Sequence, residues 1–152
     1  MNSNKLVEVN KTAESILLGQ KAYFSKTISE GDVALFAGIT GDFAPLSINK
    51  VFAESTEFQE RIIQTMLLAT YTWPVTTAIA SPGAVTIAQN STFLKPVRIG
   101  DTITAVGEVT EKHLDHKVVI IRTTCFNQHD EMVLDGSCVE LMRVHHKKEE
   151  VK

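Results

Sequence analysis

The feature that most constrains the fold is a run of apolar residues between positions 62 and 80. Its length predicts one long helix, and its apolar side chains are not confined to one stripe, which indicates burial on most sides. Pro74 is expected to kink this helix or end its regular part, and the sequence Ser81-Pro82-Gly83 is expected to stop it. A helix with this pattern needs a surrounding sheet or a partner subunit.

Strand-like runs surround this helix in the sequence. Residues 19–27 give a weak strand signal before it, and four stronger runs follow, at 84–93, 102–110, 118–127 and 132–142. We therefore predict an α+β chain with a single hot-dog fold, in which an antiparallel sheet wraps around a long central helix. Such a sheet leaves an exposed edge, which favours a homodimer or a higher homo-oligomer.

The segment between the first strand and the long helix has its own signals. Ser29 and Asp32 match a capping box with a shorter acid, so a helix is expected to start there and to end near Gly38 and Gly41. Pro45 favours an irregular loop over residues 41–50. A short helix is expected around residues 49–57.

The bulk numbers fit one domain. A chain of 152 residues can bury its own core, and we assign residues 1–15 to a flexible or leading segment, 16–144 to the domain and 145–152 to a charged tail. A net charge of -3 argues against nucleic-acid and membrane partners. Two cysteines and a polar N-terminus without a signal peptide predict a cytoplasmic protein.

Three stretches carry a family resemblance. They are Gly-Asp-Phe-Ala-Pro-Leu-Ser-Ile-Asn at 41–49, the segment 58–68 ending in Ile-Ile-Gln-Thr-Met-Leu-Leu, and Phe-Leu-Lys-Pro-Val-Arg-Ile-Gly-Asp at 93–101. In this order and spacing they resemble the MaoC-like (R)-specific enoyl-CoA hydratases, over nearly the whole chain from about Gly19 to Met142.

The resemblance implies a hydro-lyase of fatty acid metabolism. In that family an aspartate and a histidine of the first stretch hold one water, which adds across the double bond of a trans-2-enoyl thioester. A backbone N–H at the start of the central helix polarises the thioester carbonyl. The implied partner is an acyl thioester, carried by coenzyme A or an acyl carrier protein. No cofactor beyond the coenzyme A of the substrate, and no metal, is expected.

This sequence keeps part of the family's set. Asp42 falls on the catalytic aspartate, and Ser47 replaces the catalytic histidine. Gln64 and Thr65 replace a His-Gly pair and are expected to bind substrate, as is Asn49, which stands where an aspartate is common. Asp42 could alternatively brace its turn, Ser47 could cap a helix, and Gln64 could satisfy a backbone group.

Two aromatic residues of the predicted long helix, Tyr71 and Trp73, are expected to line the core or an acyl pocket. No histidine is positioned by the sequence to replace the missing imidazole, since the five present lie in predicted turns or the tail: His113, His116, His129, His145 and His146. A hydroxyl does not shuttle protons at neutral pH as imidazole does.

The resulting prediction is an (R)-specific enoyl-CoA hydratase-like protein with weak or altered activity. A positioned acid–base group contributes about 10²–10⁴ in rate, so its loss is severe for catalysis and slight for binding. A non-catalytic protein that binds acyl thioesters is therefore the alternative. A hot-dog thioesterase is a weaker one, because the carboxylates nearest the long helix, Glu54, Glu57 and Glu60, all precede it.

Overall fold

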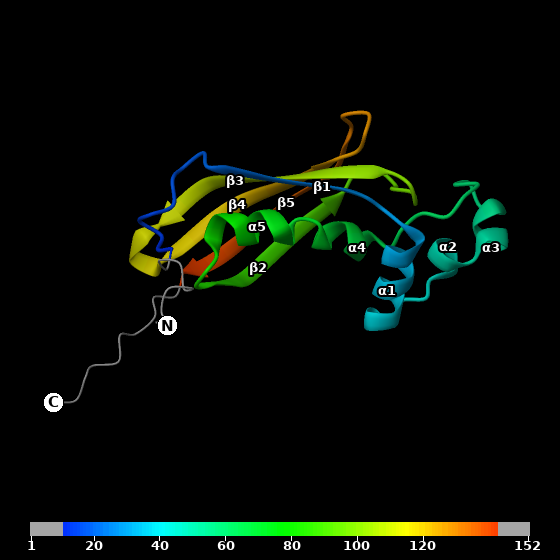
Figure 1. Ribbon diagram of the computed structural model, residues 1–152, viewed down its shortest axis with the longest axis horizontal. Helices are drawn as coiled ribbons and strands as arrows, with labels where there is room; N and C mark the ends of the chain where they lie inside the picture. Colours follow the sequence, from blue (N-terminus) through cyan, green and yellow to red (C-terminus); the bar gives the residue numbers. More distant parts are fainter. Residues whose placement is uncertain (1–10, 143–152) are drawn as a thin grey trace, which may run out of the picture.

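The computed structural model describes residues 11–142, and its centre is a five-stranded antiparallel sheet with the strand order β1-β3-β4-β5-β2 (Figure 1). The strands are β1 (Lys21–Thr27), β2 (Ala84–Phe93), β3 (Thr102–His113), β4 (Val118–Phe126) and β5 (Met132–Met142). All five predicted strands are present. β2 pairs with β5 and not with β3, so only β3, β4 and β5 form a meander.

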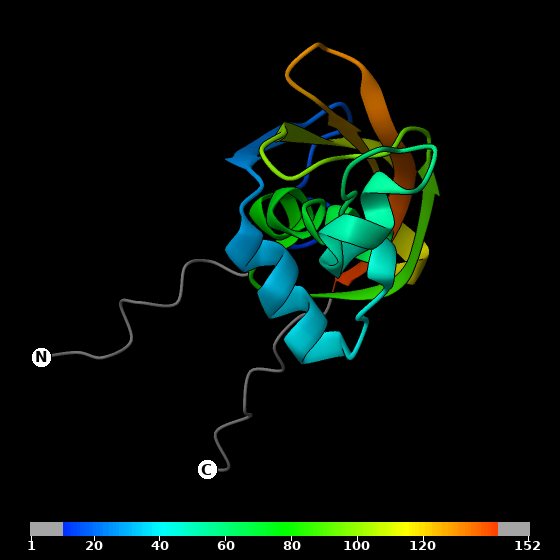
Figure 2. The ribbon, with the colours of Figure 1, turned by 90° about the vertical axis from the view of Figure 1, so that its right-hand side faces the viewer.

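The helices lie on one side of the sheet and at one end of it. They are α1 (Glu30–Thr40), α2 (Pro45–Ile48), α3 (Lys50–Glu54), α4 (Thr65–Thr70) and α5 (Trp73–Ala80), with a 3₁₀ turn η2 (Leu114–His116) between β3 and β4. The sheet curves around α4 and α5, while α1, α2 and α3 gather at the end of the molecule where α4 begins (Figures 1 and 2). This arrangement confirms the predicted sheet wrapped around central helices.

The single long helix predicted over 62–80 is wrong in two places. Ile62 and Ile63 are extended, because Ile62 forms a β-bridge with Arg98 and the Ile63 N–H donates to the Val97 carbonyl (2.9 Å). The remaining residues form two helices that meet at Tyr71 and Thr72. Pro74 has no N–H to continue the first helix, and it instead occupies the first turn of α5, where that N–H is not needed.

The segment before the central helices also differs from its prediction. The capping box of Ser29 and Asp32 at α1 is confirmed, and Gly41 ends α1 in the left-handed region at φ 77°. The predicted loop over 41–50 contains the short helix α2, because Pro45 fixes a helical φ at its first position. The helix expected over 49–57 is shorter, since α3 ends at Glu54.

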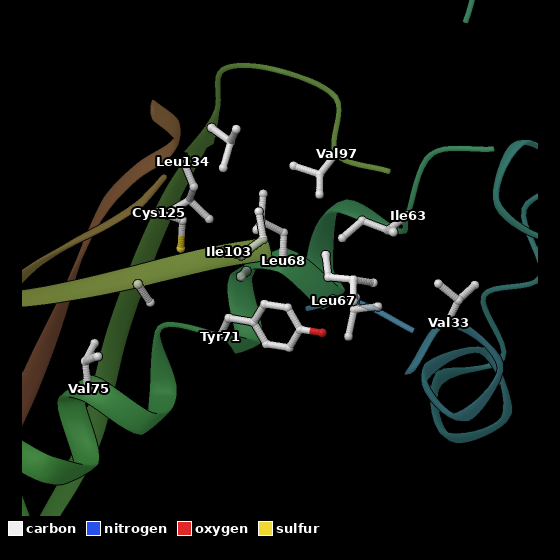
Figure 3. Packing of buried hydrophobic residues seen from close by; sticks show 14 residues of the cluster. Val33, Ile63, Leu67, Leu68, Tyr71, Val75, Val97, Ile103, Cys125 and Leu134 are labelled. Carbon is white, nitrogen blue, oxygen red and sulfur yellow. The ribbon is translucent and has the colours of Figure 1, made fainter. Parts of the chain in front are cut away.

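The core has two parts along the central helices. One surrounds α4, where Tyr71, Leu67 and Leu68 meet side chains of the sheet such as Ile103 and Leu134 (Figure 3). The other surrounds α5 and includes Ala13 and Ile16, which belong to the segment before β1. Part of the predicted leading segment therefore packs against the sheet, whereas residues 1–10 and the predicted tail at 145–152 lie outside the described residues.

The central helices are less buried than predicted. Met66 and Trp73 are 57% and 53% exposed, so α4 and α5 face the sheet on one side and solvent on the other. The edge strand β2 is also open, with Val85 48% and Ile87 55% exposed. A single protomer thus leaves apolar side chains uncovered along both elements.

Candidate functional site

Asp42 lies in the turn that follows α1. The Gly41 N–H donates to the Ala37 carbonyl (2.8 Å), and its left-handed conformation sends the chain away from the helix. The Asp42 N–H donates to the Thr40 hydroxyl (3.2 Å), and its carboxylate Oδ1 accepts from the Ala44 N–H (3.2 Å). The side chain is exposed, and Oδ2 has no partner among the described residues. Asp42 therefore braces its turn with one carboxylate oxygen while presenting the other to solvent.

Ser47 follows within α2 and is nearly buried, at 4% exposure. Its backbone N–H donates to the Ala44 carbonyl (2.9 Å), while its hydroxyl makes no hydrogen bond within residues 11–142. The two predicted catalytic residues therefore differ in burial: Asp42 is exposed and Ser47 is nearly buried. No direct hydrogen bond joins them in the described part of the chain.

Gln64 connects the Asp42 turn to the start of α4. It is 3% exposed and occupies the N-cap position of α4. Its side-chain Nε2 donates to the carbonyl of Val33 in α1 and to that of Asp42, each at 3.3 Å. Gln64 thus brings together three segments that are separate in the sequence.

Thr65 is the first residue of α4, and its side chain is exposed. The Gln64 carbonyl accepts from the N–H groups of Leu67 and Leu68, which closes the first turn. The N–H groups of Thr65 and Met66 have no acceptor among the residues that the structure describes. Free N–H groups at the start of a helix favour a carbonyl oxygen that gains negative charge.

Asn49 and Tyr71 have structural roles in this chain. The Asn49 side chain caps α3 by accepting from the Phe52 N–H (3.0 Å). Tyr71 is 7% exposed and packs on Phe24 with ring centroids 6.1 Å apart. Burial, with a smaller contribution from the charge of Asp32, raises the pKa of Tyr71 to about 12, so the phenol stays protonated. Neither residue lines the groove described next.

Trp73 lines an apolar groove of about 610 Å³ between α1 and the central helices. Its indole N–H donates to Gln89 on β2 (2.9 Å), which holds the ring at the groove wall. The groove also reaches Thr40, whose hydroxyl accepts the Asp42 N–H. The other lining residues come from α1 and from α4 and α5: Asp32, Leu35, Phe36, Ile39, Leu67, Thr70, Pro74 and Thr77.

The contribution of α1 to this groove was missed in the sequence. Leu35 and Ile39 are spaced like neighbours on one helix face, opposite the buried Val33 and Ala37. A surface helix with apolar residues on two faces is a signal that the second face meets a ligand or another chain. That signal was available in the sequence of α1.

The described residues form neither a metal site nor a membrane span. Residues 11–142 contain no group of three or more His, Cys, Asp or Glu side chains placed to hold a metal ion. In the same part of the chain, no helix is long and apolar enough to cross a membrane. Of the five histidines, His113, His116 and His129 lie at the end of β3, in η2 and in the β4–β5 turn, and the other two lie outside the described residues.

Comparison with known proteins gives a consistent result. Residues 13–141 match the family described as MaoC like domain. An (R)-specific enoyl-CoA hydratase of Rhodospirillum rubrum is 44% identical over 113 residues, covering 74% of this chain and 78% of that protein.

Solved structures agree with the sequence comparison. An unliganded R-hydratase of Pseudomonas aeruginosa superposes with a TM-score of 0.81 at 31% identity, covering 90% of this chain and 88% of that chain. The (R)-hydratase of Aeromonas caviae involved in PHA biosynthesis also gives a TM-score of 0.81, at 32% identity, covering 85% and 98%. These matches confirm the hot-dog fold and the resemblance carried by the three sequence stretches. The chain belongs to the MaoC-like dehydratase family.

Proposed function

We propose that this chain is an (R)-specific enoyl-thioester hydratase, which adds water to an enoyl thioester or removes it from a 3-hydroxyacyl thioester. One observation carries the proposal: the exposed Asp42 carboxylate lies in a turn that Gln64 ties to the start of α4. Gln64 thereby links the segment of Asp42 to the neighbouring Thr65, whose N–H has no acceptor among the described residues. The hydratase names of the matched relatives support the same activity.

In the proposed reaction, Asp42 is the base and the Thr65 N–H is the donor to the thioester carbonyl. The water oxygen bonds to C3 as one water proton passes to the Asp42 carboxylate. The π electrons of the C2=C3 bond move toward the carbonyl, whose developing charge the Thr65 N–H stabilises. C2 then takes up a proton from the protonated Asp42, which restores the carboxylate, so that H and OH have added across the double bond.

Because of Ser47, we expect the hydratase activity of this chain to be weak or altered. Its hydroxyl can hydrogen-bond a water but cannot take up or release a proton at neutral pH as imidazole does. The binding part of the site, which uses the apolar groove and the Thr65 N–H, does not depend on Ser47.

The two alternatives are less well supported. A non-catalytic acyl-thioester binding protein and a hot-dog thioesterase both fit the fold, but the matched relatives are named as hydratases. The thioesterase alternative also needs a carboxylate on or beside the central helices. Of its candidates, Glu54 and Glu60 line a small polar pocket with Lys50 and Arg61 and do not line the apolar groove.

The proposed substrate is an acyl thioester on coenzyme A or an acyl carrier protein, within fatty acid metabolism. The acyl chain would lie in the groove between α1 and Trp73, and the reaction as written needs no further cofactor. We also propose a cytoplasmic location. The free thiols of Cys125 and Cys138 are buried in the core, as is usual for a protein of a reducing compartment.

We further propose a homodimer that covers the open edge of β2. This strand ends the sheet and exposes Val85 and Ile87, and an uncovered apolar edge favours pairing with a second copy. An Ile87→Lys variant is expected to shift the protein toward the monomer, as measured by light scattering after size-exclusion chromatography. A wild-type protein that is monomeric at micromolar concentration would overturn this proposal.

Hydration of a short trans-2-enoyl-CoA tests the activity. Loss of the enoyl-thioester absorbance, with chiral analysis of the product, should show the (R)-3-hydroxyacyl thioester. Asp42→Asn keeps an acceptor for the Ala44 N–H but removes the base, so its rate should fall by about 10²-fold or more. Ser47→His, measured beside it, should raise the rate if its imidazole reaches the water. A wild-type protein that binds enoyl-CoA without turning it over would reject the hydratase in favour of a binding protein.

A further inference from the structure

The buried amide of Gln64 has only one orientation that fits its surroundings. Its two neighbours, the carbonyl oxygens of Val33 and Asp42, are both acceptors. Exchanging the amide oxygen and nitrogen would place three acceptors together, so Nε2 must face both carbonyls. The side-chain oxygen Oε1 then faces elsewhere, and it is buried without a partner in the part of the chain that the structure describes.

An unpartnered acceptor at this position needs an explanation. Leaving a buried polar atom without a hydrogen bond destabilises the folded state, and native proteins keep few such atoms. Gln64 is only 3% exposed, yet it belongs to the same network as the exposed Asp42. A donor that arrives with the substrate, such as a water or a hydroxyl group, would satisfy Oε1.

We propose that Gln64 has two roles in this site, as the anchor of Asp42 through Nε2 and as a second acceptor for the attacking water through Oε1. The inference rests on the hydratase function proposed above. Nε2 fixes the backbone of Asp42 against α1 and α4. Oε1 accepts one O–H of the water, while the Asp42 carboxylate accepts the other.

This division of roles leaves a lone pair of the water directed at C3 of the enoyl thioester. The amide neither gains nor loses a proton, because the water proton that is removed passes to Asp42. Gln64 therefore orients the water, as one side of an imidazole would, but takes no part in proton transfer. Its effect should lie in the rate of turnover more than in substrate affinity.

Two substitutions separate this role from a merely structural one. Gln64→Met keeps the length of the side chain and removes both the donor and the acceptor, and its kcat should fall on the order of 10- to 100-fold, with KM changing less than about 2-fold. Gln64→His restores one donor and one acceptor when the imidazole is neutral. Its kcat should recover at high pH and decline as the imidazole takes up a proton, near or below pH ~6.5. The wild-type amide gives no such decline.

A second measurement reports on the anchor without any turnover. Residues 43 and 47–49 have backbone N–H groups that are hydrogen-bonded within the Asp42 segment. Hydrogen–deuterium exchange of a peptide covering residues 41–49 should be about 10-fold faster in Gln64→Met than in wild type. In Gln64→His it should stay close to wild type.

Thr123→Val is the matched control, because Thr123 also carries a buried side-chain oxygen without a partner but lies on β4. It should leave kcat, KM and exchange of residues 41–49 unchanged. If hydrogen–deuterium exchange of residues 41–49 is the same in Gln64→Met as in wild type, Gln64 does not anchor Asp42. If the kcat of Gln64→His does not change with pH, Gln64 is not an acceptor for the water. If Asp42→Asn is inactive while Gln64→Met keeps full activity, this inference fails and the hydratase stands. If the wild type hydrates no enoyl thioester, the hydratase itself fails, and with it the role of Oε1.

Discussion

The sheet and the α1–α3 end of the molecule are built in opposite ways. In the sheet, long antiparallel strands pair along most of their length, with one register shift in each of the β3–β4 and β4–β5 pairs, and side chains such as Val119 and Ile121 are fully buried. At the other end, α2 and α3 have four and five residues, and several of their apolar side chains, such as Val51, are exposed. The candidate base Asp42 lies at this second end.

This difference indicates where stability and function reside. Cooperative strand pairing supports most of the free energy of unfolding, whereas segments with few buried contacts open more easily and adapt to ligands. The groove and the turn of Asp42 belong to the second kind, and Gln64 is the buried link that fastens them to α4. Substitutions in the two regions should therefore have different consequences.

Two glycines give the sharpest form of the comparison and the largest expected effect. A Cβ on Gly136 in β5 would lie 2.3 Å from the Asn90 carbonyl oxygen of β2, so the strands would have to separate. Gly136→Ala should lower the free energy of unfolding by about 3 kcal/mol. A Cβ on Gly38 in α1 would meet nothing within 4 Å, and Gly38→Ala should raise the free energy of unfolding by about 0.5–1 kcal/mol.

Urea denaturation of the two glycine variants checks this prediction, with circular dichroism as the signal. If both variants lowered the free energy of unfolding by the same amount, the two regions would tolerate an added methyl group equally poorly. Such a result would remove the distinction between the sheet and the α1–α3 end.

A groove residue should show the reverse pattern, with a smaller effect. Ile39 is 75% exposed and lines the groove, so Ile39→Ala should change the free energy of unfolding by less than about 0.5 kcal/mol. If the acyl chain lies against Ile39, truncating the Ile39 side chain to alanine removes roughly 1 kcal/mol of apolar contact with the substrate. The KM for a medium-chain enoyl-CoA should then rise about 5-fold. Steady-state kinetics with short and medium chains measures this. Val51→Ala, exposed on α3 and outside the groove, should leave both KM values unchanged.

The same contrast explains what the sequence predicted. The strands at 84–93 and 132–142 were predicted with their observed bounds, because local alternation and flanking turns determine them. The helix at 62–80 was not, because Ile62 and Ile63 become extended through contacts with Val97 and Arg98, about 35 positions away. Asp42 could be selected from its motif. The groove could not, because it depends on how α1 lies against α4 and α5.

The smallest expected effect lies inside the sheet and concerns its one buried carboxylate among the described residues. Glu140 on β5 is 3% exposed and accepts from the Thr86 hydroxyl (2.8 Å). Burial raises its pKa above the ordinary value of 4.5, while the hydrogen bond from Thr86 partly opposes this. The folded state therefore keeps the Glu140 proton over a pH range in which the unfolded chain has lost it.

The sign of the pH dependence follows from this difference. Below about pH 4.5 both states hold the proton, and the contribution of Glu140 to stability is fully present. As pH rises through 4.5 toward the folded-state pKa, the folded state binds more protons than the unfolded state, so the free energy of unfolding falls. Glu140→Gln keeps an acceptor for the Thr86 hydroxyl and does not titrate. Its stability relative to wild type should therefore increase with pH across this range and then level off.

Denaturation of both proteins between pH 4.5 and 8 measures this difference, and Glu57→Gln, at an exposed carboxylate after α3, controls for the change in net charge. A constant offset between wild type and Glu140→Gln across that range would mean that Glu140 titrates alike in both states. The interior of the sheet would then be more accessible to water than its burial indicates, and the sheet would resemble the α1–α3 end in this respect. A difference that grows with pH would instead confirm that the apolar interior, which stabilises the fold, also suppresses ionisation there, while Asp42 remains in contact with water.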